Sequence, residues 1–254
     1  MAEEGKPPLD GSVELGGLGA PRSVRDPVPA GSIVVATFEL YARYPLLFLA
    51  LALGVVLPYD TLVLFATGAG PVAKGGGLGS SYLLTLFLVS PLISALHVHA
   101  VAELRAGRTP RLGEIAARGL RVLPTAAATA MMVALGVGVG LVLLIVPGVI
   151  LAFRWYVAVQ AAAIENRGWL PALKRSRALT RGVYLHLFWF GILIALITQI
   201  PLTIATRAVT GHDTLAGAFI AGVLVHAFIL AFTALATALL YFDLAERRGA
   251  PAGS

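Results

Sequence analysis

The chain of 254 residues is 58% hydrophobic and only 13% charged, and its mean hydropathy is +0.86. Soluble domains carry about 25% charged residues, so this composition excludes an ordinary soluble protein and predicts membrane spans. The lack of cysteine excludes disulfides, iron–sulfur clusters and thiolate zinc sites. The net charge is +6, but the basic residues lie in short segments between apolar runs. That pattern does not predict a nucleic-acid partner, which would need one basic surface.

The first 31 residues are rich in proline and glycine, carry mixed charge and contain no long apolar run. They predict a disordered tail. A cleavable signal peptide needs a basic stretch followed directly by an apolar block, and residues 1–31 contain none, so we expect the tail to stay in the cytoplasm. Residues 32–246 predict a single transmembrane helical domain, and residues 247–254 a second short cytoplasmic tail.

Six stretches are long and apolar enough to cross a membrane, because about 20 apolar residues span a hydrocarbon layer of about 30 Å. One block, 124–164, would form a helix of about 60 Å, so it must reverse. Pro147-Gly148 is the only breaker pair near its middle and predicts the turn. Within the first span, Pro58-Tyr59-Asp60 is the position where a helix end or a break is most expected. The other expected spans lie within 38–66 and at about 82–102, 184–206 and 215–241.

Sixteen of the nineteen Lys and Arg residues lie in the tails and in alternate connecting segments, whereas Lys74 and Arg207 lie in the others. Cytoplasmic segments of membrane proteins carry the excess of Lys and Arg. This distribution therefore predicts that both termini are cytoplasmic. The sixteen are Lys6, Arg22, Arg25, Arg43, Arg105, Arg108, Arg111, Arg118, Arg121, Arg167, Lys174, Arg175, Arg177, Arg181, Arg247 and Arg248.

Three basic segments beside the expected spans have amphipathic patterns typical of helices in the membrane interface, namely 32–45, 111–123 and 169–182. In the last, Pro171 suits a first helical turn and Gly182 a C-terminal stop. Each segment precedes an odd-numbered span. Either the chain contains three copies of one surface helix and one membrane hairpin, or cytoplasmic loops simply attract arginine.

Several short motifs follow one another along the second half of the chain. An apolar run ends in Pro147-Gly148, a helix closes on Glu165, and a Leu and a Gly follow at Leu179 and Gly182. With the segment 31–44, these features resemble the membrane domain of glycerophosphoryl diester phosphodiesterases over about residues 31–249. The other matching residues are Ala172, Leu173, Arg175, Ser176, Tyr241, Asp243, Leu244 and Arg247.

The resemblance implies an architecture rather than a reaction. Some members of that family join the membrane domain to a catalytic barrel, and others stand alone. A (β/α)₈ barrel needs about 250 residues, whereas the segments outside the expected spans are far shorter. We therefore expect a stand-alone, multi-pass protein of a bacterial inner membrane, with no catalytic site and no cofactor.

Arg154 is a charged residue within an expected span, and such residues are costly in lipid and mark candidate sites. It lies seven residues past Pro147, about 10 Å along a helix. Asp60 is its first candidate partner and His226 the second. We expect a structural pair or snorkelling of Arg154, with contact to a lipid or solute headgroup as the alternative.

Acidic and basic residues also gather where spans four and six return to the cytoplasm. Opposite charges there predict a clamp that holds the surface helix 169–182 against the bundle. The alternative is a pocket in which Arg175, Ser176 and Arg177 bind an anionic phosphate headgroup. The candidate residues are Glu165, Lys174, Arg175, Ser176, Arg177 and Asp243.

Two further patterns are interpreted structurally. Gly136 and Gly140 form a GxxxG motif, which favours close helix packing inside the bundle over dimerisation. His97 and His99 are two residues apart and point in different directions on a helix, so they do not predict a metal site.

The leading functional hypothesis is a non-enzymatic scaffold or lipid-interacting module. Its candidate partners are membrane lipids, including anionic headgroups, and another membrane protein. The alternative is a small transporter or lipid flippase, which needs broken helices around a polar cavity at mid-depth. An enzyme needs converging acid, base or metal groups, which the sequence does not assemble.

Overall fold

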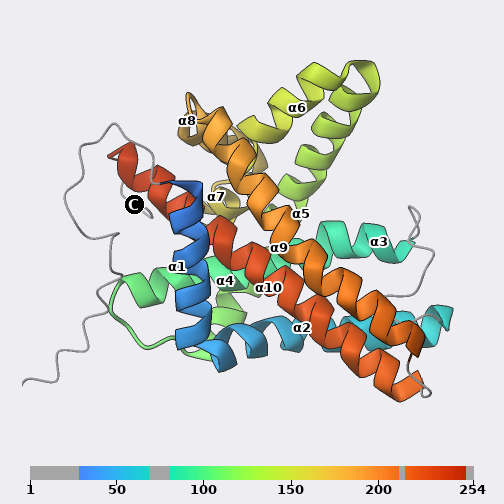
Figure 1. Ribbon diagram of the computed structural model, residues 1–254. Helices are drawn as coiled ribbons and strands as arrows, with labels where there is room; N and C mark the ends of the chain where they lie inside the picture. The colour runs from blue at the N-terminus through green and yellow to red at the C-terminus, as the bar shows by residue number, and fades with distance from the viewer. Residues whose placement is uncertain (1–28, 69–79, 212–214, 250–254) are drawn as a thin grey trace, which may run out of the picture.

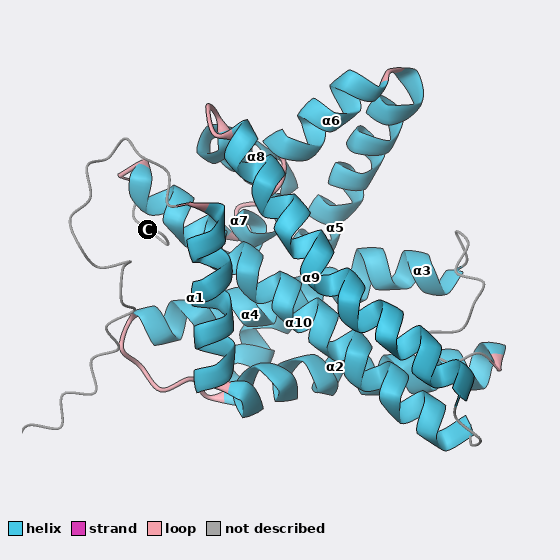
Figure 2. Ribbon diagram, viewed as in Figure 1, coloured by secondary structure: helices cyan, strands magenta, loops and turns pink. Residues whose placement is uncertain are grey.

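The computed structural model describes residues 29–68, 80–211 and 215–249, and these ranges form helices and no strand (Figure 2). The expected all-α class is confirmed. Most of the tail expected over 1–31, the segment 69–79 and residues 250–254 lie outside the described residues. The elements are α1 (Ala30–Arg43), α2 (Pro45–Thr67), α3 (Ser80–Leu84), the π-helical η1 (Thr85–Val89), α4 (Ser90–Arg105), α5 (Leu112–Leu143), α6 (Ile145–Arg154), α7 (Ala158–Glu165), α8 (Trp169–Thr180), α9 (Tyr184–Gly211) and α10 (Leu215–Arg247).

Six helical rods in the described ranges are long and apolar enough to cross a membrane, as predicted. Four are the single helices α2, α5, α9 and α10. The other two are composite, because α3, η1 and α4 continue one another, and α6 and α7 together form the fourth span. In Figure 1 the α5–α6 hairpin projects to the upper right, away from the far ends of α2, α9 and α10.

The first span is α2, which begins at Pro45 within the expected stretch 38–66, and the residues before Tyr44 belong to α1. Tyr44 interrupts the helix with φ −130° and ψ 51°, and α2 begins with Pro45. Proline suits this position, since the first helical N–H has no partner within the helix. α2 then continues through Pro58 to Thr67, so the span neither ends nor breaks at Pro58-Tyr59-Asp60.

The surface helix expected over 111–123 is not a separate element, and that expectation is wrong. α5 runs without interruption from Leu112 through Pro124 to Leu143. Its first turns bury Ile115 and Val122, and they pack on α4. The amphipathic pattern therefore reflects packing of the extended third span, and the proposed second repeat lacks its own surface helix.

The surface helix expected over 169–182 is present as α8, from Trp169 to Thr180. Pro171 lies in its first turn, as predicted. Gly182 follows the helix with φ +84°, a conformation that glycine adopts without steric cost. Ala172, Leu173 and Leu179 are buried, and α8 packs on α5, α6 and α7.

The third and fourth spans reverse at Leu144, three residues before the predicted Pro147-Gly148 turn. Leu144 is extended, with φ −158° and ψ 130°, between the end of α5 and the start of α6. Pro147 lies instead in the first turn of α6, where its missing N–H is tolerated. The breaker pair therefore marks the beginning of a helix, and the turn is one residue long.

The GxxxG motif packs inside the chain, as predicted. A Cβ added at Gly140 would lie 2.7 Å from the Gly148 Cα of α6, and one added at Gly136 would overlap the Trp155 ring. The two glycines therefore let α6 and Trp155 approach the α5 backbone.

The fourth span is broken in the middle. α6 ends at Arg154 and α7 begins at Ala158, and Trp155, Tyr156 and Val157 between them form a turn. Neither proline nor glycine occupies this turn, so no residue there signals the break. The two halves differ in surroundings, since α6 shows large exposed apolar side chains and α7 is mostly buried.

The centre of the bundle is filled by aromatic and small side chains. Phe48, Phe190, Phe232 and Tyr241 are fully buried, together with alanines of α4, α7 and α10. α10 packs on α2, α4 and α9, so it forms the axis of the bundle. Close packing of this kind positions the helix ends where the charged residues gather.

We expect Gly140→Ala to destabilise the α5–α6 hairpin, because the new methyl group meets the Gly148 backbone. Overpacking of this kind costs about 1–3 kcal/mol. Gly138→Ala is the matched control, since nothing lies within 4 Å of a Cβ added there. The free energy of unfolding of both variants in lipid–detergent mixtures checks this, and equal values contradict it.

Candidate functional site at the basic end of the bundle

The basic segments of the described chain meet at one end of the bundle. Arg105 in the last turn of α4 pairs with Glu246 in the last turn of α10. Arg248 donates a hydrogen bond to the Arg181 carbonyl after α8. These contacts join the α4–α5 connection, α8 and the end of α10 into one surface, here named the basic end. Arg105, Arg181 and Arg248 thus lie together at this end, while Lys74 lies outside the described residues.

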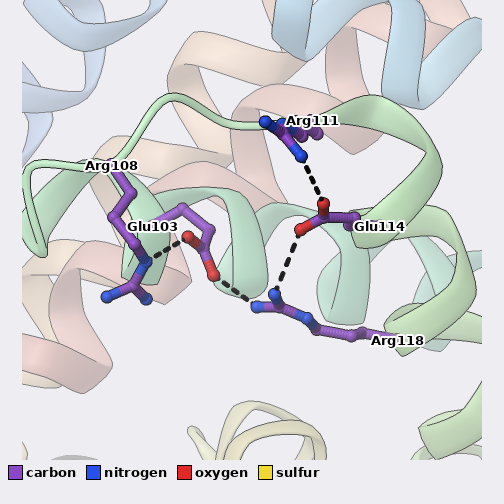
Figure 3. Close-up of polar contacts among 5 residues, drawn as sticks. All are labelled: Glu103, Arg108, Arg111, Glu114 and Arg118. Atoms are coloured by element: carbon purple, nitrogen blue, oxygen red, sulfur yellow. Dashed lines mark hydrogen bonds and ion pairs between the residues drawn. The ribbon is translucent and has the colours of Figure 1, made fainter.

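Glu103 organises an ion-pair cluster between α4 and α5 (Figure 3). Its carboxylate is 8% exposed and pairs with Arg108 Nε at 2.6 Å and with Arg118 of α5. Arg118 also reaches Glu114, which pairs with Arg111 at 3.2 Å. The hydrogen bond to Glu103 raises the pKa of Arg108. A nearly buried carboxylate with two guanidinium partners fixes the end of α4 against the start of α5.

The arginines of this cluster were expected at this end of the bundle from the sequence, whereas Glu103 was not. The available signal was its isolation, because Glu103 is the only acidic residue between Asp60 and Glu114. An acid that ends a span among arginines is a candidate ion-pair centre.

The predicted clamp on α8 exists between Glu165 and Arg175. Arg175 Nε lies 2.7 Å from Glu165 Oε1, and the Tyr241 hydroxyl of α10 lies 3.4 Å from the same oxygen. Both charged side chains are less than a quarter exposed. α7, α8 and α10 are therefore joined at one carboxylate.

Ser176 fixes α8 to the break in the fourth span. Its hydroxyl donates to the Arg154 carbonyl at 3.0 Å and accepts from the Val157 N–H at 3.3 Å. The Thr180 hydroxyl also donates to the Arg154 carbonyl, at 3.2 Å. These hydrogen bonds supply partners for the backbone groups at the break. An unpaired backbone N–H or carbonyl group is costly in an apolar environment.

The headgroup pocket of Arg175, Ser176 and Arg177 is not assembled. Ser176 is fully buried and its hydroxyl is occupied by backbone groups, and Arg175 is paired with Glu165. Of these three residues, Arg177 alone is exposed.

One face of α8 remains exposed, and it is both basic and apolar. Lys174 and Arg177 are exposed, and Trp169 and Leu170 are 42% and 47% exposed. Arg181 extends the basic stripe beyond the helix. A face of this composition suits the interface between lipid headgroups and acyl chains. The residues Trp169, Leu170, Lys174, Arg177 and Arg181 are here named the α8 face.

Asp243 does not join the clamp on α8. Its Oδ1 accepts from Arg247 Nη2 at 3.0 Å, one turn along α10. The candidate cluster therefore divides into a clamp (Glu165 and Arg175), a local pair on α10 (Asp243 and Arg247) and exposed cations.

Asp60 pairs with His226 and not with Arg154. His226 Nδ1 lies 3.1 and 3.0 Å from the two Asp60 carboxylate oxygens. Arg154 is half-buried at the end of α6, and its Nε has no hydrogen-bond partner among the described residues. Both candidate partners of Arg154 were therefore wrong, and they pair with each other, because α2 packs on α10 while the α5–α6 hairpin diverges.

Within the described residues, no group of three His, Asp or Glu side chains is placed to hold a metal ion. His97 is fully buried, with Nδ1 2.8 Å from the Ile93 carbonyl and its ring stacked on Phe48. We therefore assign no metal or cofactor to the histidines of α4.

Comparisons with protein-family models, curated proteins and solved structures found no match to the chain. The resemblance to the glycerophosphoryl diester phosphodiesterase membrane domain stays a prediction based on its motifs.

We expect Glu103→Gln to destabilise the protein by about 1.5–3 kcal/mol, the range for hydrogen bonds to charged groups. The substitution leaves Arg108 and Arg118 without the carboxylate that they share. Glu114→Gln is the matched control, since Glu114 is 53% exposed and an exposed ion pair contributes about 0–1 kcal/mol. Denaturant unfolding compares the two, and a Glu103→Gln variant as stable as Glu114→Gln contradicts the role of Glu103.

Proposed function

We propose that the protein is a non-enzymatic scaffold of a bacterial inner membrane that binds anionic lipid headgroups through the α8 face. The observation that carries the proposal is the composition of that face, in which Lys174 and Arg177 lie beside the exposed Trp169 and Leu170. Tryptophan favours the headgroup level, and cations beside it attract phosphate.

The attachment of α8 supports this role. Arg175 and Ser176 hold its inner side to Glu165 and to the break in the fourth span. The α8 face is therefore presented at a fixed position relative to the spans. A flexible segment must become ordered when it binds, and that ordering has an entropic cost. A helix that is already fixed in place binds lipid without that cost.

In the proposed orientation the basic end and both termini face the cytoplasm. This follows from the excess of Lys and Arg at that end. The anionic leaflet surface on the cytoplasmic side then lies next to the α8 face, and each cation near such a surface contributes about 1 kcal/mol.

The filled centre of the bundle favours a scaffold over a transporter. Phe48, Phe232 and Tyr241 occupy the axis, and Arg154 lies away from the Asp60–His226 pair. A transport site at mid-depth needs polar groups that converge on a cavity. The polar groups of the described spans are instead distributed over separate contacts.

A small transporter or lipid flippase remains the second candidate, and one observation favours it. The fourth span is broken between Arg154 and Ala158, and broken spans are typical of transporters.

The test is lipid retention by native mass spectrometry of protein reconstituted in mixed micelles with phosphatidylglycerol. We expect the double variant Lys174→Gln/Arg177→Gln to lose about 2 kcal/mol of binding free energy, about thirtyfold in affinity. Both side chains are exposed, so the fold is expected to tolerate the change.

Two controls separate lipid binding from stability. Lys174→Arg/Arg177→Lys keeps both charges and is expected to retain phosphatidylglycerol. Arg175→Gln removes the Glu165 partner and is expected to lower stability more than lipid retention. Equal retention of phosphatidylglycerol by the Lys174→Gln/Arg177→Gln variant and the parent protein contradicts the proposal.

A further inference from the structure

A carboxylate and an imidazole face each other inside the membrane-spanning region. Asp60 of α2 is 2% exposed, and both of its carboxylate oxygens lie within 3.1 Å of His226 Nδ1 on α10. Asp60 is about 22 Å along α2 from Pro45 and about 10 Å from Thr67, so it lies well below either end of the helix. Ionisable residues at such depth mark ion or proton sites by default.

No other charged group in the described chain pairs with Asp60. The helices packed against α2 are α1, α4, α5 and α10, together with η1. The Tyr59 hydroxyl is bonded to Thr85 and to the Ser81 carbonyl, and His97 is stacked on Phe48. The remaining ionisable side chains of these helices are Glu39, Tyr41, Arg43, His99, Glu103, Arg105, Glu114, Arg118, Arg121, Tyr241, Asp243, Glu246 and Arg247, and Tyr82 lies in α3 before η1. The helices α7, α8 and α9 also pack on α10, and their described ionisable side chains are Glu165, Lys174, Arg175, Arg177, Tyr184 and His186.

The charge of the pair depends on one proton. When Asp60 is ionised, His226 Nδ1 must carry the hydrogen that faces it, and a neutral imidazole leaves the pair with a net charge of about −1. A proton added at Nε2 makes the imidazolium, and the pair becomes neutral overall. A low-dielectric environment favours the neutral combination strongly.

The two side chains differ in access. His226 is 20% exposed, whereas Asp60 is 2% exposed. Since Nδ1 is turned to Asp60, Nε2 is the ring nitrogen that remains for exchange. His226 is therefore the member of the pair that lies nearer the surface of the bundle, and Asp60 contacts it at Nδ1.

We propose that Asp60 and His226 form an intramembrane proton-binding site between α2 and α10. Binding forms one N–H bond at His226 Nε2 and breaks one O–H bond of hydronium, with release of water and no change of oxidation state. Asp60 is a positioning residue, which orients the ring through Nδ1 and supplies the charge that holds the added proton. The site is independent of the α8 face and of its lipid ligand.

The test is a titration of ¹⁵N-histidine-labelled protein in lipid nanodiscs, followed by NMR of the ring nitrogens from about pH 5 to about 8. His226→Gln identifies the His226 signals by their loss. We expect the added proton to appear at Nε2 of His226, with Nδ1 still bound to Asp60. Asp60→Asn is expected to lower the proton affinity of His226 about tenfold or more, because it removes the opposite charge at contact distance.

His186 of α9 provides the internal control, since it belongs to a different helix and its ring-nitrogen signals are expected to be the same in both proteins. Unchanged proton affinity of His226 in Asp60→Asn, or no titration of His226, overturns the proposal. If Asp60→Asn does not fold, infrared spectroscopy of His226→Gln gives a second reading. We then expect a protonated carboxyl band that the parent protein lacks at the same pH, and identical carboxyl spectra overturn the proposal.

Discussion

Lipid neither hydrates a charge nor hydrogen-bonds a backbone group, and most of this structure follows from that constraint. Charged side chains leave the spans and gather at the basic end, where Glu103 and Glu165 pair with arginines. Where the fourth span is broken after Arg154, hydroxyl groups of α8 donate hydrogen bonds to the Arg154 carbonyl. Where an acid stays at depth, as Asp60 does, a histidine of a neighbouring helix faces it.

The number and order of the spans were predictable because each needs a long apolar segment, and that property is local to the sequence. Helix ends were less predictable. Pro147-Gly148 predicted a turn, but proline is also tolerated in the first turn of a helix. The chain reverses at Leu144 instead. The break at Trp155 to Val157 has no local signal, because the partners that make it tolerable come from α8.

The candidate site was predictable in composition and only partly in pairing. The Glu165–Arg175 contact followed from opposite charges at the end of the fourth span and on the surface helix that follows it. Ser176 was a candidate headgroup-binding residue because it lies between two arginines in the sequence. Its position on α8 instead directs the side chain inward, where it bonds to the backbone. The partner of Asp60 depended on which helices cross, and a single sequence does not determine helix crossing. Glu103 was missed because its importance comes from burial between two arginines.

The central claim is that the basic end and the α5–α6 tip lie on opposite sides of a membrane. The chain has no cysteine, so single substitutions give unambiguous labelling. Arg177→Cys and Leu144→Cys both place a thiol at an exposed position. In sealed cells and in inverted vesicles, a membrane-impermeant thiol reagent is predicted to label Leu144→Cys from outside only and Arg177→Cys from the cytoplasmic side only. Labelling of both variants from the same side would contradict the account.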